Sequence, residues 1–189
     1  MGRWKPDARG RLLQAAIDLF GEQGYEETTV AQIAERAGLT KATLFRHFSD
    51  KREILFQGQG ALVEAATAAV GGAPDDAAPF ELVAAGVTAL CAVHREDDRG
   101  LGRRLGAITA SSAELQERAA LKRSIVTDAL FRALADRLDD VHLAGVLADA
   151  GIRAYYDGYA AWVADADGGA TLRETAAAEL RAYEALIRP

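Results

Sequence analysis

Two short helical patterns separated by a glycine constrain this chain more than any other feature. After Thr29, apolar residues within 30–37 recur at the spacing of one helix face. Gly38 follows, and glycine commonly ends a helix in the left-handed conformation. Thr40 can then cap a further helix that runs to about His47. Two short helices joined by a tight glycine-containing turn predict a helix-turn-helix.

Helical patterns also flank this pair. Residues 7–23 place apolar side chains on one face, and Gly24 is expected to end that helix. Downstream, Asp50 and Glu53 have the spacing of a capping box. They predict a helix that begins there and continues to about Val70.

The rest of the chain also reads as helical. The segment "GGAPDDAAP" at 71–79 is the clearest break. Helical patterns follow at about 80–97, 101–108, 112–138, 142–164 and 171–187. We therefore predict an all-α fold of about nine helices. Its domains are expected at 1–52, a helix-turn-helix domain, and 53–189, a second helical domain.

Charge is distributed unevenly along the chain. The 189 residues carry a net charge of −6, but residues 1–60 hold 9 Lys/Arg against 8 Asp/Glu and the remainder is acidic. Only the N-terminal third is therefore suited to approach a polyanion. Cys91 is the single cysteine, so no intrachain disulfide can form. Because no apolar run approaches the ~20 residues that span a bilayer, we expect a cytoplasmic protein without a membrane partner.

The chain lacks the common catalytic motifs. It has three histidines and one cysteine, and no HExxH, GxSxG or P-loop pattern appears. No Glu-x-x-His pair of the di-iron type is present either. We therefore predict no enzyme activity, no catalytic or metal-binding residues and no cofactor. One alternative function is that of a helical protein that binds a small molecule and does not bind DNA. This alternative would leave the cations at 41–52 unexplained.

The helix after Gly38 has two different faces. Leu44 and Phe48 lie four residues apart and are expected to pack inward. The other positions project outward or towards the rim: Lys41, Ala42, Thr43, Phe45, Arg46 and His47. Such a face suits a DNA major groove, because a small residue permits close approach, cations meet phosphate or guanine, and apolar groups meet a thymine methyl.

The stretch "RLLQAAIDLFGEQGYEETTVAQIAERAGLTKATLFRHFSDKREIL" resembles the DNA-binding domain of TetR-type transcriptional regulators. The resemblance covers about residues 9–56. It implies DNA-facing positions at Thr29, Thr40, Lys41, Thr43, Phe45, His47 and Lys51, with base contacts near Lys41 and Ala42. Phe45 stands where the family most often has tyrosine, so we expect an apolar contact there, with Arg46 able to compensate.

The same resemblance implies a C-terminal dimer interface and a ligand pocket. Apolar stripes in the last two helices suggest the interface residues Ile152, Tyr155, Tyr159, Leu180, Tyr183 and Ile187. Candidate pocket residues are Cys91, His94, Arg104, Leu105, Ile108, Phe131, Tyr156 and Trp162. Ordinary packing within one chain is the alternative for both groups.

These expectations combine into one functional hypothesis. A homodimer would bind a palindromic double-stranded operator, most simply as a repressor, with its two recognition helices about one DNA turn apart. A small apolar or amphipathic effector would favour the DNA-free state. Its signal would travel through the predicted helix from Asp50 to Val70.

Overall fold

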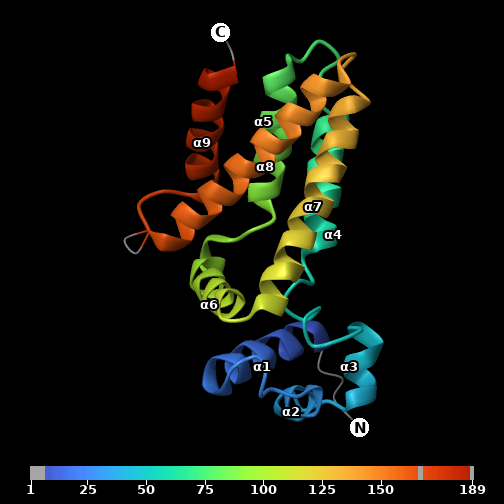
Figure 1. The fold of residues 1–189 in the computed structure, drawn as a ribbon, viewed down its shortest axis with the longest axis vertical. Helices are drawn as coiled ribbons and strands as arrows, with labels where there is room; N and C mark the ends of the chain where they lie inside the picture. The colour runs from blue at the N-terminus through green and yellow to red at the C-terminus, as the bar shows by residue number, and fades with distance from the viewer. Residues whose placement is uncertain (1–6, 166–167, 188–189) are drawn as a thin grey trace. The chain divides into compact units, whose positions relative to one another are not determined.

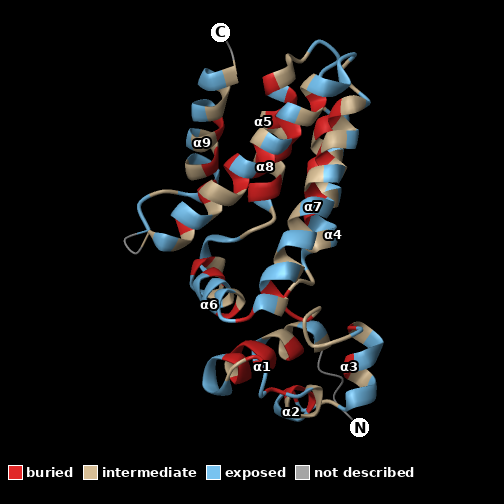
Figure 2. Cartoon of the chain, viewed as in Figure 1, coloured by how far each residue is buried: buried red, intermediate tan, exposed pale blue. Residues whose placement is uncertain are grey.

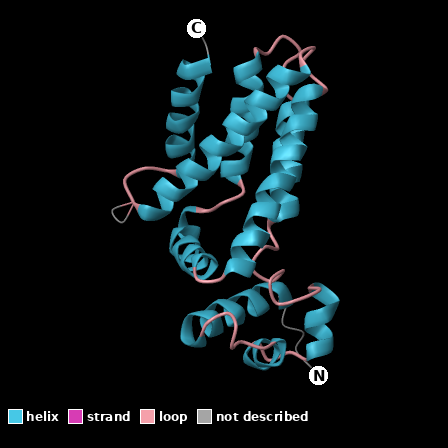
Figure 3. Ribbon diagram, viewed as in Figure 1, coloured by secondary structure: helices cyan, strands magenta, loops and turns pink. Residues whose placement is uncertain are grey.

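The computed structural model describes residues 7–165 and 168–187. In those ranges it contains nine α-helices, one short 3-10 helix and no strand (Figures 1 and 3), which confirms the all-α prediction. The described chain divides into two compact units. The first unit comprises the residues up to Gln57 together with 104–120, and the second comprises 58–103 together with the residues from 121 onward. The sequence predicted a single boundary after residue 52 and gave no sign of the inserted segment.

The first unit begins with the three predicted helices. Their bounds are α1 Ala8–Gln23, α2 Val30–Arg36 and α3 Lys41–His47. The carboxylate of Asp7 accepts the Gly10 N–H at the start of α1. The predicted capping box of Thr29 and Gln32 is present at the start of α2. Local polar residues thus define where these helices begin, because they satisfy amide groups that the first turn leaves unpaired.

The turn between α2 and α3 depends on Gly38. Its φ of 63° lies in the left-handed region that residues with a Cβ rarely adopt. The Gly38 N–H donates to the Glu35 carbonyl at 2.8 Å, and the Leu39 N–H donates to the Ala34 carbonyl at 2.8 Å. The guanidinium of Arg11 on α1 also donates to the Gly38 carbonyl. The chain can therefore reverse sharply while the carbonyls at the end of α2 remain paired.

The predicted helix from Asp50 to Val70 is corrected by the structure. Asp50 does accept the Glu53 N–H at 3.1 Å, but residues 51–58 form successive turns rather than an α-helix. Their backbone bonds join Leu55 to Arg52 and Phe56 to Glu53, a separation of three residues. The regular helix α4 is Gln59–Gly71, with Gly58 as its N-cap residue. The division between the two units falls at this irregular segment.

The remaining helices follow the predicted order. Their bounds are α5 Pro79–Ala92, α6 Arg99–Ala110, α7 Ala113–Ala135, α8 Val141–Ala164 and α9 Leu172–Ile187, with a 3-10 helix at Glu96–Asp98. Both α6 and α7 have one part in each unit. None of these helices, over the described residues, has the length and apolar character needed to cross a bilayer.

The core of the second unit is built from facing helix stripes. α5 packs against α4, α8 and α9, and α8 packs against α9; Figure 2 shows buried residues on α5, α7 and α8. Gly158 brings α8 very close to α9, because a Cβ at this position would lie 2.4 Å from the Cα of Ala176. The Thr175 hydroxyl bridges the same crossing by donating to the Gly158 carbonyl at 2.9 Å. Small residues thus set the distance between these two helices.

Candidate nucleic-acid interface and effector region

The α3 helix separates its inward and outward residues as the sequence predicts. Leu44 is fully buried and Phe48 is almost so. The exposed positions are Lys41, Ala42, Phe45 and Arg46, and the half-buried rim positions are Thr43 and His47. Phe45 is 52% exposed, which is unusual for a large aromatic side chain and leaves its ring available to a partner. The outer face of α3 therefore combines cations, a small residue and an aromatic ring.

Two predicted phosphate-contacting threonines serve first as helix caps. The Thr29 hydroxyl accepts the Gln32 N–H at 3.3 Å, and the Thr40 hydroxyl accepts the Thr43 N–H at 3.1 Å. The side chains of Thr40 and Thr43 also lie within 3.0 Å of each other. Both caps are exposed. The Thr29 hydroxyl also donates its own proton to Gln32 Oε1 at 2.9 Å, so a contact from this hydroxyl to a DNA phosphate would have to replace that bond.

Lys51 differs from the other predicted DNA-facing residues. It is half-buried, and its Nζ donates to the carbonyls of Tyr25 at 2.8 Å and Thr28 at 3.2 Å. The same ammonium lies 4.0 Å from the centre of the Tyr25 ring. These contacts hold the loop between α1 and α2. An ammonium has three donors, so most of its hydrogen-bonding capacity is used within the protein.

Replacing Lys51 with alanine is therefore expected to affect stability more than DNA binding. Hydrogen bonds from a charged donor contribute about 2 kcal/mol each in favourable cases, so we expect a loss of roughly that size. Thermal unfolding followed by circular dichroism would measure it. The dependence of DNA affinity on salt should keep its slope. A slope reduced by about one unit with unchanged stability would instead show that Lys51 contacts phosphate.

The segment 104–120 completes the first unit through polar contacts that the sequence did not predict. Arg118 on α7 reaches the Glu53 carboxylate with nitrogen–oxygen distances of 2.6 and 2.9 Å. Both side chains are largely buried, at 18% and 28% exposure, so this pair is less screened by solvent than a surface ion pair. Arg52 likewise contacts Glu114 at 3.1 Å as well as Asp50 at 2.8 Å. The Arg118–Glu53 and Arg52–Glu114 pairs join residues more than 60 positions apart, and no local pattern signals these two pairs.

Further contacts tie the same segment to α1 and the loop after it. Arg104 lies 2.6 Å from the Asp18 carboxylate, and the buried Ser112 donates its hydroxyl to Glu26 at 3.2 Å. Arg104, Leu105 and Ile108 thus belong to the first unit. The other predicted pocket residues belong to the second unit.

Two predicted pocket residues of the second unit, His94 and Trp162, contribute to a polar and aromatic cluster. His94 follows α5, and its Nε2 lies 2.6 Å from the hydroxyl of Tyr155 on α8. Trp162 is fully buried, with its indole N–H donating to Glu96 at 3.2 Å. The guanidinium of Arg99 lies 5.1 Å from the centre of the Trp162 ring. This cluster joins α8 to the segment between α5 and α6.

Burial lowers the pKa of His94. The charge of Asp98 acts to raise this pKa, and the charge of Lys122 acts to lower it further. The folded protein therefore binds a proton at His94 less readily than the unfolded chain, whose histidines titrate near pH 6.5. Stability should be complete above that pH and should fall as the pH drops below it. Urea unfolding between pH 7.5 and pH 5.5 would measure the loss. His94→Gln should flatten the profile, whereas His142→Gln, on an exposed site of α8, should leave it unchanged.

The residues predicted at a dimer interface contribute, to different degrees, to the core of the second unit. Ile152, Tyr155 and Leu180 are buried within the chain's own second unit, with exposures of 1%, 2% and 6%. The stripes on α8 and α9 therefore pack against each other and against α5. Tyr159, Tyr183 and Ile187 are partly buried against the same core. Packing within one chain accounts for the three buried residues, and the dimer interface stays a prediction.

A compact helix-turn-helix whose second helix exposes cations and an aromatic ring is characteristic of DNA-binding proteins. Residues 12–57 match the family model of bacterial regulatory proteins of the tetR family. Residues 12–57 thus resemble the DNA-binding region of TetR-family transcriptional regulators.

Curated relatives share the N-terminal region. The HTH-type transcriptional regulator TcmR of Streptomyces glaucescens is 45% identical over 62 residues, which cover 33% of this chain and 27% of that protein. The HTH-type transcriptional repressor KstR2 of Mycobacterium tuberculosis is 43% identical over 47 residues, covering 25% and 24%. The chain thus spans only about a quarter of the length of the curated relatives that it matches.

Solved structures show that the fold extends over the whole chain. A TetR-family regulator from Streptomyces coelicolor aligns with a TM-score of 0.58 and 23% identity, covering 100% of both chains. The transcriptional regulator FadR from Bacillus subtilis, in complex with stearoyl-CoA, aligns with a TM-score of 0.59 and 19% identity, covering 91% of this chain and 95% of that one. At these identities the likeness concerns the fold alone.

Proposed function

We propose that this protein is a ligand-responsive repressor that binds a palindromic DNA operator as a homodimer. The outer face of α3 is the observation that carries the proposal. It exposes Lys41, Ala42, Phe45 and Arg46 on a short helix held by two caps, while Leu44 anchors the opposite face. A rigid helix of this kind can enter a major groove and present its side chains to base edges.

A dimer would use residues other than the buried stripes. Among the exposed positions of α8 and α9, the last turns carry several small side chains, namely Ala160, Ala161, Ala164, Ala178, Ala182 and Ala185. Leu186 stands beside them with 82% exposure. Small residues allow helices of two subunits to approach closely. Two-fold symmetry would then present two copies of α3 to the two halves of a palindrome.

Release by an effector would act through α6 and α7. Residues 51–58 do not form a continuous helix. The predicted helix from Asp50 to Val70 therefore cannot transmit the signal, and α6 and α7 take its place in this proposal. Both α6 and α7 run without interruption from one unit into the other. Their first-unit portions hold Glu53 and Asp18 through Arg118 and Arg104. An effector that favours another arrangement of these helices would shift the population away from the DNA-bound state.

Selection of binding sites from random duplex DNA tests the proposal directly. We expect enrichment of a palindrome whose half-sites lie about 10 base pairs apart, centre to centre. Affinity for the selected duplex should fall steeply as the salt concentration rises. Sedimentation of the complex should give two chains per duplex. A chain that remains monomeric and enriches no sequence would refute the proposal.

A further inference from the structure

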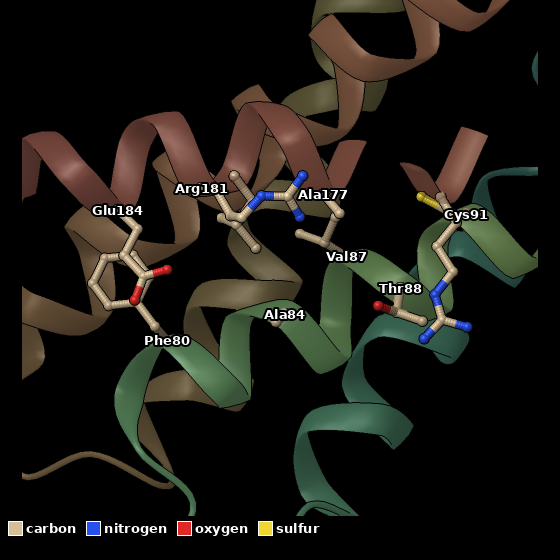
Figure 4. Close-up of a pocket in the computed structure, with 10 residues that line it drawn as sticks. Phe80, Ala84, Val87, Thr88, Cys91, Ala177, Arg181 and Glu184 are labelled. Carbon is tan, nitrogen blue, oxygen red and sulfur yellow. The ribbon is translucent and has the colours of Figure 1, made fainter. Parts of the chain in front are cut away.

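A groove runs between α5 and α9 within the second unit. Figure 4 shows Phe80, Ala84, Val87, Thr88 and Cys91 along α5, with residues of α9 opposite them. The groove is a cavity of about 140 Å³. The α9 residues that line it are Arg173, Ala177, Leu180, Arg181 and Glu184. Each helix therefore presents one face at spacings of three or four residues, which is the pattern of facing helix stripes.

The groove remains open because of small residues in facing positions. Ala84 on α5 and Ala177 on α9 both line it, and neither side chain extends beyond Cβ. Val87 and Leu180 provide an apolar wall at the same level. An engineered apolar cavity of about 150 Å³ holds benzene, so this space can hold an apolar body of about six carbons.

The two ends of the groove differ in charge. Glu184 lies at the Phe80 end, where its carboxylate would repel an anion. Arg173 lies at the other end with Thr88 and Cys91, and its charge acts on the Cys91 thiol. No hydrogen bond of the Thr88 hydroxyl is found in the described part of the chain. The hydroxyls of Thr67 and Thr127, in contrast, donate to carbonyls four residues earlier in their helices.

We propose that this groove binds a small monocarboxylic acid, with its carboxylate at Arg173 and Thr88 and its apolar body between Ala84 and Ala177. Guanidinium and hydroxyl groups are both donors to a carboxylate, and an arginine can hold both of its oxygens. Arg181 adds a second positive charge along the path. The assignment of this acid as the effector rests on the proposed regulatory function, whereas its binding to the groove does not.

Cys91 provides a direct reporter of occupancy. It is the only cysteine of the chain, it is 5% exposed, and it lines the groove. Burial raises its pKa to about 11, so its reaction with the neutral reagent N-ethylmaleimide is expected to be slow and sensitive to access. The rate for the full-length protein at pH 8.5 would be followed by mass spectrometry. Ligands would be added at constant ionic strength.

Hexanoate is the probe, and 1-hexanol and hexylamine are its neutral and cationic counterparts. Hexanoate at ten times its dissociation constant should slow the reaction about tenfold. Hexylamine should give no protection, and hexanol should protect only at much higher concentration. Arg173→Gln, on an exposed site, should raise the hexanoate concentration needed by about tenfold while leaving the hexanol response unchanged. Equal protection by all three compounds, or none by hexanoate, would overturn the proposal.

Filling the groove tests its location. Ala177→Leu should abolish protection by hexanoate, and Ala84→Leu provides a second filling variant should the first fail to fold by circular dichroism. Protection that persists in a folded filling variant would overturn the proposed site. Affinity for the selected duplex is measured in parallel with and without hexanoate. Protection without a change in DNA affinity would support the site and overturn its role as effector site, whereas a chain that binds no DNA would overturn only the proposed function.

Discussion

Replacing Lys41 and Arg46 together with alanine is expected to weaken binding to the selected duplex by about two orders of magnitude. Both side chains are exposed on the outer face of α3. A good contact to a base edge or phosphate contributes about 1–3 kcal/mol, so two lost contacts account for a change of that size. Fluorescence anisotropy with labelled duplex at several salt concentrations would measure both the affinity and its salt slope. Stability should change little, in contrast to Lys51→Ala.

A matched control separates contacts from overall charge. Arg103→Ala combined with Arg132→Ala removes the same two positive charges from exposed positions on α6 and α7. This control is expected to retain most of the affinity, because long-range charge effects are largely screened at physiological salt. Equal losses in the two double variants would show that net charge, rather than the face of α3, controls binding.

The second large effect is expected at the crossing of α8 and α9. In Gly158→Ala the new Cβ would lie 2.4 Å from the Cα and 2.5 Å from the N of Ala176, so backbone rather than a flexible side chain must move. The helices would separate, and the bond from the Thr175 hydroxyl to the Gly158 carbonyl would lengthen. We expect destabilisation of about 3 kcal/mol. Urea unfolding monitored by circular dichroism would measure it.

Gly145 offers a control within the same helix. A Cβ there would meet only Phe131, at 3.9 Å, which is an ordinary contact distance. Gly145→Ala should therefore stabilise the protein by up to about 1 kcal/mol through helix propensity. If both substitutions had the same sign and size, the close approach at Gly158 would not control how α8 and α9 pack.

The helix-turn-helix was predictable because its signals are local. Thr29 and Thr40 cap the helices, and Gly38 turns the chain between them. The burial of Leu44 and the exposure of Phe45 follow from helical periodicity alone. Features set within ten neighbouring residues were thus read correctly from the sequence.

Other features depend on contacts between distant residues and could not be read in this way. Helical periodicity does not distinguish the turns at 51–58 from a regular helix, because bonds three and four residues apart support similar apolar spacing. An apolar stripe also does not reveal whether its partner belongs to the same chain. Ile152 and Leu180 face their own core for this reason. The candidate ligand groove depends on two alanines, Ala84 and Ala177, that carry no sequence motif.

The discontinuous first unit limits how this chain can be recombined with others. A chimaera that transfers only residues 7–57 to a foreign sensor would leave behind Arg104, Ser112, Glu114 and Arg118. Glu53 and Glu26 would then lose the groups that neutralise or hydrogen-bond them. A chimaera that exchanges the second unit should therefore include residues 104–120 together with residues 7–57. The junctions then fall inside α6 and α7, so the number of residues in each helix must be kept for its side chains to face the same way.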